Sequence, residues 1–278
     1  MNTARDSGLR IVMLAVIICI SLLGFWQPYP VHAIDLANIL APPSATHLFG
    51  TDHLGRDVFS RVMAGAQPSL AAAGLALVLT LTAGILAGSV IAIAPPTCAD
   101  AVKRLAEIVI AAPQLVVALV VAAILGAGPL TAAIALALTG WAHYALVVAA
   151  LIERLTAEPY WRAAEALGVD HIGGLRRHLL PNLTAPLGAL AGADAARAVI
   201  LIASLGFLGL AADAGRPEWG AMIHEYRIFI FEAPRLLFYP MAATALLALS
   251  FNLLLDPGFT ASRTIPPQQP PEAHRNGR

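Results

Sequence analysis

The dominant feature of this sequence is a series of five long stretches with almost no aspartate, glutamate, lysine or arginine. A helix needs about 20 mostly apolar residues to cross the roughly 30 Å hydrocarbon core of a bilayer. Hydrophobic residues make up 58% of the chain and charged residues 12%, whereas a soluble domain has roughly 45–50% and about 25%. We therefore predict an all-α, polytopic helical membrane protein. The five stretches are 11–26, 62–99, 108–152, 182–212 and 236–255.

Turn and proline residues divide these stretches into six predicted transmembrane helices. The stretch 108–152 is about two bilayer thicknesses long as a helix, and the glycine- and proline-containing turn 126–129 divides it in two. In the second stretch, prolines near both ends place the span close to 69–94. The other stretches supply one helix each.

The distribution of basic residues predicts which ends lie in the cytoplasm. With the N-terminus inside, six spans place eleven of the 17 lysines and arginines in inner segments, five in outer segments and Arg197 within a span. Cytoplasmic loops carry such an excess of lysine and arginine. We therefore expect a multi-pass protein of the inner (cytoplasmic) membrane with both termini in the cytoplasm.

The chain is expected to divide into three parts. Residues 1–68 form an N-terminal transmembrane helix and an outer scaffold segment, 69–256 form a core with five helices, and 257–278 form a disordered cytoplasmic tail. Two interpretations of the first helix stay open, because Val31-His32-Ala33 is similar to the cleavage site of a signal peptide. The helix is either retained or removed, and the later helices keep their orientation in both cases.

The predicted inner segment 153–181 is long for a connection between spans. Pro159 suits the first turn of a short helix, the alanines that follow favour its continuation, and Gly168 suits its end. Small side chains leave the backbone open to a docking protein. A helix that only rests on the membrane interface is the alternative.

The same segment resembles the EAA loop of ABC importer permeases, the element that docks in a cleft of the cytoplasmic ATPase. The match consists of an Ala-Ala pair, a glycine four residues later and a His-x-Leu-Pro ending, with arginine in place of glutamate at the first position. This resemblance implies an ATPase contact made by Arg162, Ala163, Ala164, Glu165, Gly168, His178, Leu180 and Pro181.

A second resemblance covers the outer segment that precedes the core. The run from His47 to Arg61 is similar to the periplasmic segment of peptide and nickel permeases, and further landmarks follow in the family's order over about residues 30–256. It implies the type I ABC importer permease fold. The implied partners are a homologous second permease subunit, two cytoplasmic ATP-binding subunits and a periplasmic binding protein. The implied scaffold residues are Gly50, Thr51, Asp52, Gly55, Arg56 and Asp57.

Two departures from the family pattern limit what the resemblance implies. Ile202 stands where many peptide permeases have glutamate, and Asp256-Pro257-Gly258 replaces the usual Gly-Asp ending of the last span. The first departure, together with the sequence of 33–63, favours nickel or a metal chelate over a dipeptide or oligopeptide as the substrate. The binding protein usually imposes that choice, so both substrate classes stay open.

Charged and histidine side chains inside the predicted spans mark a candidate translocation path. Asp194 and Arg197 lie three residues apart on one helix face, where they can neutralise each other. Intramembrane charges usually face the bundle interior or a wet cavity, so the pair is either structural or part of the path. His143 is either a packing residue or a substrate contact.

The sequence favours transport over catalysis or metal binding. His47, Asp52 and His53 form the one cluster that resembles metal ligands, but a scaffold role is favoured, in which the aspartates cap a helix or pair with arginines. No GxxxxGK[ST], HExxH or GxSxG motif is present, so neither ATP hydrolysis nor other catalysis is expected of this chain. We expect no cofactor, no bound metal and no nucleic-acid partner. An ion-coupled secondary transporter or a membrane enzyme is the alternative.

Overall fold

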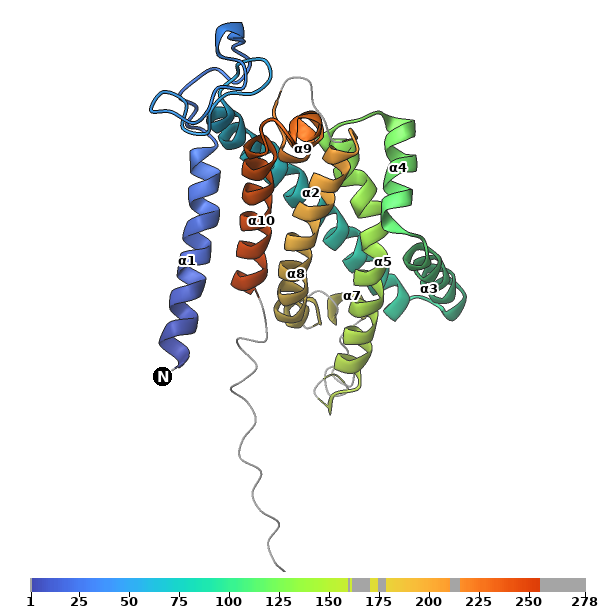
Figure 1. Cartoon of the computed structure of the whole chain (residues 1–278). Helices are drawn as coiled ribbons and strands as arrows, with labels where there is room; N and C mark the ends of the chain where they lie inside the picture. The colour runs from blue at the N-terminus through green and yellow to red at the C-terminus, as the bar shows by residue number, and fades with distance from the viewer. Residues whose placement is uncertain (1, 160, 162–170, 175–178, 211–215, 256–278) are drawn as a thin grey trace, which may run out of the picture.

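The computed structural model describes residues 2–159, 161, 171–174, 179–210 and 216–255. Within these ranges the chain is mostly helical, with an isolated antiparallel bridge between Thr51 and Asp57. Figure 1 shows an elongated bundle with an irregular segment at one end, between α1 and α2. The predicted all-α fold is confirmed.

Four of the described helices are long and apolar enough to cross a membrane, and they form the body of the bundle. The last two agree closely with the predicted stretches 182–212 and 236–255, and the turn expected at 126–129 separates α4 from α5. The four helices are α2 (Val58–Ile93), α5 (Pro129–Thr156), α8 (Leu180–Phe207) and α10 (Arg235–Leu255).

A further span is broken into two helices. Neither α3 (Pro96–Ala111) nor α4 (Gln114–Leu125) is long enough to cross a membrane alone, but together they have the length and apolarity of a span. The two helices are bent by 95° at the break between them. The break occurs at Ala112 and Pro113. A proline disfavours the helical conformation of the residue before it, and Ala112 is indeed extended, with φ −78° and ψ 134°.

The predicted count of six spans is not confirmed. The described helices supply four spans, or five if the bent pair counts as one. α1 (Asn2–Leu23) is not among them, because its apolar part, Ile11–Leu23, is shorter than those of the four helices. The remaining short elements are η1 (Leu36–Asn38), α7 (His171–Gly174), α9 (Trp219–Tyr226) and η3 (Arg227–Phe229).

α2 begins at Val58, before the predicted span 69–94, and ends at Ile93, close to the predicted end of that span. Asp57 caps this earlier start, because its Oδ2 accepts a hydrogen bond of 2.7 Å from the backbone N–H of Ser60. Pro68, which was expected to precede the span, lies inside α2. Membrane helices tolerate internal proline where neighbouring groups satisfy the freed backbone.

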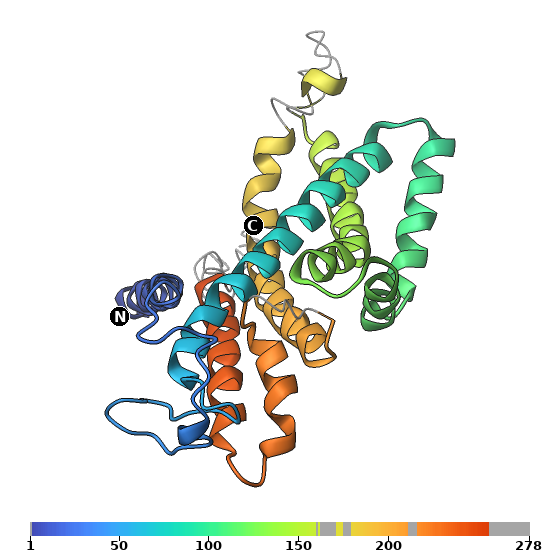
Figure 2. The same cartoon turned by 90° about the horizontal axis from the view of Figure 1, so that it is seen from above.

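The contact between α2 and α5 forms the centre of the bundle. A Cβ atom on Gly84 of α2 would lie 2.3 Å from the Cβ of Tyr144, and one on Gly88 would lie 2.6 Å from the Cβ of Val148. Small residues allow membrane helices to approach this closely. Seen from above, α2 crosses the whole molecule obliquely (Figure 2).

Candidate functional site

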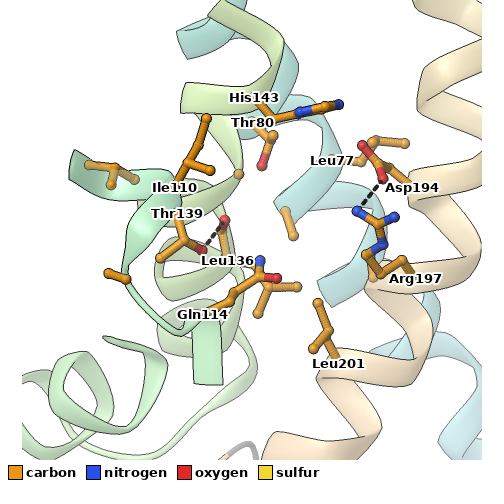
Figure 3. A pocket seen from close by; sticks show the side chains of 15 residues that line it. Leu77, Thr80, Ile110, Gln114, Leu136, Thr139, His143, Asp194, Arg197 and Leu201 are labelled. Carbon is orange, nitrogen blue, oxygen red and sulfur yellow. Dashed lines mark hydrogen bonds and ion pairs between the residues drawn. The ribbon is translucent and has the colours of Figure 1, made fainter. Parts of the chain in front are cut away.

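A cavity of about 280 Å³ lies among α2, α3, α4, α5 and α8, beside the break between α3 and α4. Figure 3 shows that its polar side chains come from several helices and surround a shared space. Apolar side chains complete the wall. The polar lining residues are Thr80, Gln114, Thr139, His143, Asp194 and Arg197.

The predicted charged pair forms on the α8 side of this cavity. Arg197 Nη1 lies 3.2 Å from Asp194 Oδ1, across one turn of the helix. The two side chains differ in exposure, with 69% of the Arg197 side chain exposed and 16% of the Asp194 side chain. Asp194 is therefore largely covered, whereas Arg197 extends into the open space of the cavity.

His143 lies on α5 and lines the same cavity, so the structure brings all three predicted path residues together. Its ring stands edge-on to that of Tyr144, with 6.2 Å between the ring centroids. The side chain of His143 is exposed, whereas that of Tyr144 is buried in the contact with α2. This arrangement leaves the imidazole of His143 available to a ligand in the cavity.

Gln114 and two threonines of the cavity were not predicted from the sequence. Gln114 is the first residue of α4, directly after Pro113, so the helix break places its amide at the cavity (Figure 3). The Thr139 hydroxyl donates to the backbone oxygen of Leu136 at 3.1 Å, which satisfies its hydrogen bonding within α5. A proline within an uncharged stretch was the signal that could have located the break and hence Gln114.

The predicted scaffold segment is held at the N-terminal end of α2 by a network of buried charges. Asp52 is fully buried, and its Oδ2 accepts a 2.7 Å hydrogen bond from Arg56 Nε. Glu225 of α9 bonds both to Arg56 Nη2 and to Arg61 Nη2, the latter at 2.8 Å. The hydroxyl of Tyr226 donates to Asp52 Oδ2 at 3.1 Å. The network therefore ties α9 to the start of α2.

Glycines and capping side chains shape the rest of this segment. Gly55 has φ +74°, and a Cβ atom on it would lie 1.8 Å from the backbone oxygen of Asp35, so only glycine fits. The Thr51 hydroxyl donates to the backbone oxygen of Asn38 and accepts from the N–H of Ala41 at 2.9 Å. The predicted capping by an aspartate is confirmed for Asp57.

The same network bears on the metal-ligand alternative. Asp52, His53 and Glu225 place one potential ligand atom each within 4.8 Å of one another. Arg56 and Arg61 already neutralise both carboxylates. Burial alone would lower the pKa of Arg56, but its contacts with Glu225 and Asp52 outweigh that effect and raise this pKa. A cation would have to displace these guanidinium groups. His47 instead pairs with Asp57, with 2.9 Å between Nδ1 and Oδ1.

Most residues of the predicted ATPase contact lie outside the described ranges. These are Arg162, Ala163, Ala164, Glu165, Gly168 and His178. Leu180 and Pro181 form the start of α8. Nearby, Trp161 and Leu179 are buried in an apolar cluster with Ile152 and Leu183, which packs the adjoining ends of α5 and α8 together.

Comparison with known proteins gives this arrangement a context. Residues 81–260 match the family described as "Binding-protein-dependent transport system inner membrane component". The chain is 34% identical over 249 residues to the nickel transport system permease protein NikC of Escherichia coli strain K12, covering 89% of this chain and 90% of that protein.

Two further relatives are similar over nearly their whole length. The dipeptide transport system permease protein DppC of Alkalihalophilus pseudofirmus is 33% identical over 256 residues, covering 91% of this chain and 84% of that protein. The metal-staphylopine import system permease protein CntC of Staphylococcus aureus strain NCTC 8325 is 30% identical over 256 residues, covering 91% of this chain and 88% of that protein.

A solved structure supports the fold independently. A chain of the MetNI methionine ABC transporter, in an inward-facing conformation, matches with a TM-score of 0.57 and 17% sequence identity, covering 72% of this chain and 95% of that chain. The family match covers well over half of the chain, and the relatives cover nearly all of it. The chain therefore belongs to the inner-membrane permease components of binding-protein-dependent ABC importers, which are not themselves catalytic.

Proposed function

We propose that the cavity between α2, α5 and α8 is part of the path along which this importer permease moves its substrate. The observation that carries the proposal is the meeting of His143, Asp194 and Arg197, from two helices, in one cavity among apolar spans. Polar and charged groups inside a membrane protein are costly, and they typically mark substrate and ion pathways. The exposure of Arg197 leaves its guanidinium open to a ligand, which a structural ion pair alone does not require.

The substrate that we propose is nickel or a metal chelate, with a dipeptide or oligopeptide as the alternative. The absence of the peptide-branch glutamate supports the first choice. Ile202 of α8 occupies that position and is 1% exposed in the apolar core of the bundle, so this chain offers no carboxylate there. The named relatives include both nickel and metal-staphylopine permeases, and also a dipeptide permease.

The assembly that we propose contains a homologous second permease, two cytoplasmic ATPases and a periplasmic binding protein. The segment 153–181 would dock on an ATPase, and the scaffold segment within 1–68 would lie on the periplasmic side. The core would cover 69–256 and the tail 257–278, with both termini in the cytoplasm. Membership of the binding-protein-dependent family supports the ATPase and the binding protein as partners.

Uptake by a deletion strain tests the substrate, and co-purification tests the assembly. Loss of the gene is expected to lower uptake of nickel, or of a nickel chelate, more than uptake of dipeptides. Lost peptide uptake with unchanged nickel content would reject the proposed substrate. A tagged chain is expected to bring down ATPase subunits, which neither an ion-coupled secondary transporter nor a membrane enzyme would do.

A further inference from the structure

The charges of the cavity nearly cancel, which bears on the chemical form of the substrate. Asp194 is its one carboxylate among the described lining residues, and Arg197 holds that carboxylate at 3.2 Å. A guanidinium carries five N–H donors, whereas this ion pair engages only one of its nitrogens. The exposed remainder of Arg197 therefore offers donors and positive charge to a ligand.

A bare divalent cation finds a poor site in this cavity. Nickel is bound in proteins by imidazole, carboxylate and related ligands. Among the described lining residues, His143 supplies the one imidazole, and Asp194 is already paired with Arg197. Over the part of the chain that the structure describes, the cluster of three potential metal ligands lies in the network around Asp52 and not in the cavity.

A carboxylate finds a better site. Arginine is suited to carboxylates because its planar fork can donate two parallel hydrogen bonds. Figure 3 shows Arg197 and Gln114 extending into the same space from opposite walls, so that the Gln114 amide can add a further donor. Gln114 reaches this position because the chain breaks at Pro113.

We propose that Arg197 and Gln114 bind a carboxylate of the substrate, so that it crosses as a carboxylate-bearing molecule, such as a chelated metal or a peptide, and not as a bare cation. This proposal rests on the cavity being part of the translocation path. It assigns Arg197 the main contact, Gln114 a supporting one, and Asp194 the task of orienting Arg197.

The test uses the complete importer with its binding protein, reconstituted in proteoliposomes with ATP inside. Three probes are offered separately: radioactive Ni²⁺ as the aquo ion, radioactive Ni²⁺ with excess histidine, and radioactive glycyl-glycine. The variants are Arg197→Gln, Gln114→Leu and Asp194→Asn, with Arg197→Lys as the charge-conserving control. Stimulation of the ATPase by the loaded binding protein is measured alongside uptake.

Arg197→Gln is expected to lower uptake of the carboxylate-bearing probe at least tenfold, and Gln114→Leu about threefold. Arg197→Lys should fall between wild type and Arg197→Gln, because lysine keeps the charge but loses the fork. Asp194→Asn is expected to lower uptake less than Arg197→Gln does, because it removes the group that orients Arg197 but keeps the guanidinium. ATPase stimulation should stay within about twofold in all variants.

Two results would overturn the carboxylate site while leaving the proposed path intact. One is increased uptake of the aquo ion by Arg197→Gln, as expected if the arginine merely repels a bare cation. The other is an equal loss of uptake in Arg197→Gln and Asp194→Asn, as expected of a structural ion pair. If the wild-type importer moved none of the three probes, the proposed function itself would fail.

Discussion

Adding a single methyl group at Gly84 is expected to separate the two central helices. A Cβ atom there would lie 2.3 Å from the Cβ of Tyr144 and 3.0 Å from the backbone oxygen of Trp141, whereas carbon atoms in contact lie about 3.5–4.0 Å apart. The nearest atoms belong to the backbone or lie next to it, so no side-chain rotation relieves the clash. Overpacking of this kind costs about 1–3 kcal/mol.

Gly74 provides the matched control, because it lies on the same helix and a Cβ atom there would meet no atom within 4 Å. Replacing either glycine by alanine gains about 1 kcal/mol of helix propensity, so this gain cancels between the two variants. The stability difference between Gly84→Ala and Gly74→Ala therefore isolates the overpacking. It corresponds to about a 5- to 150-fold change in the ratio of folded to unfolded protein.

Unfolding in mixed micelles of increasing denaturing-detergent content, followed by tryptophan fluorescence, measures this difference. Trp141 reports on the region directly, because its backbone oxygen is among the atoms that the new methyl group would meet. Equal midpoints for the two variants would show that α2 and α5 do not pack as closely as described. A lower midpoint for Gly74→Ala together with an unchanged midpoint for Gly84→Ala would lead to the same conclusion.

Three further predictions concern other parts of the chain. Replacing Gly168 by aspartate is expected to leave insertion and abundance unchanged but to abolish transport; normal transport with the ATPases still bound would make 153–181 a mere interfacial anchor. Burial raises the pKa of Glu218 above its ordinary 4.5, so the native state loses stability as pH rises through the window above 4.5. The stability of Glu218→Gln relative to wild type should therefore increase over that window, and an unchanged difference would contradict the raised pKa. A cysteine at Phe231, which is 96% exposed, should react with an impermeant thiol reagent in intact cells, whereas one at Arg154 should not; the reverse labelling pattern would invert the topology.

The parts of the fold that the sequence predicted are those determined by local hydropathy. α8 and α10 lie within a few residues of the expected stretches, because the length and apolarity of a membrane span are properties of consecutive residues. The pairing of Asp194 with Arg197 was predictable for the same reason, since both residues lie on one turn of one helix. Asp57 likewise caps its own helix.

The parts that were missed depend on contacts between distant segments. The network around Asp52 pairs Arg56 and Arg61 with Glu225, more than 160 residues away, and no local pattern identifies that partner. The contact between Gly65 of α2 and Trp219 of α9 likewise joins segments that are far apart in the sequence. The break at Pro113 had a local signal, but hydropathy alone does not distinguish a bent pair from one straight span.

The length of α2 has a consequence for its orientation in the bilayer. Its 36 residues rise about 1.5 Å each, so the helix is about 54 Å long, against a hydrocarbon thickness of roughly 30 Å. Even at a tilt of about 40°, the upper end of the usual range, the hydrocarbon covers only about 39 Å of helix. Roughly ten residues must then project into water or headgroups. Ser60 and Arg61 make the start of α2 its polar end, so we expect this end to project, and α2 then connects the scaffold segment with the apolar part of the bundle.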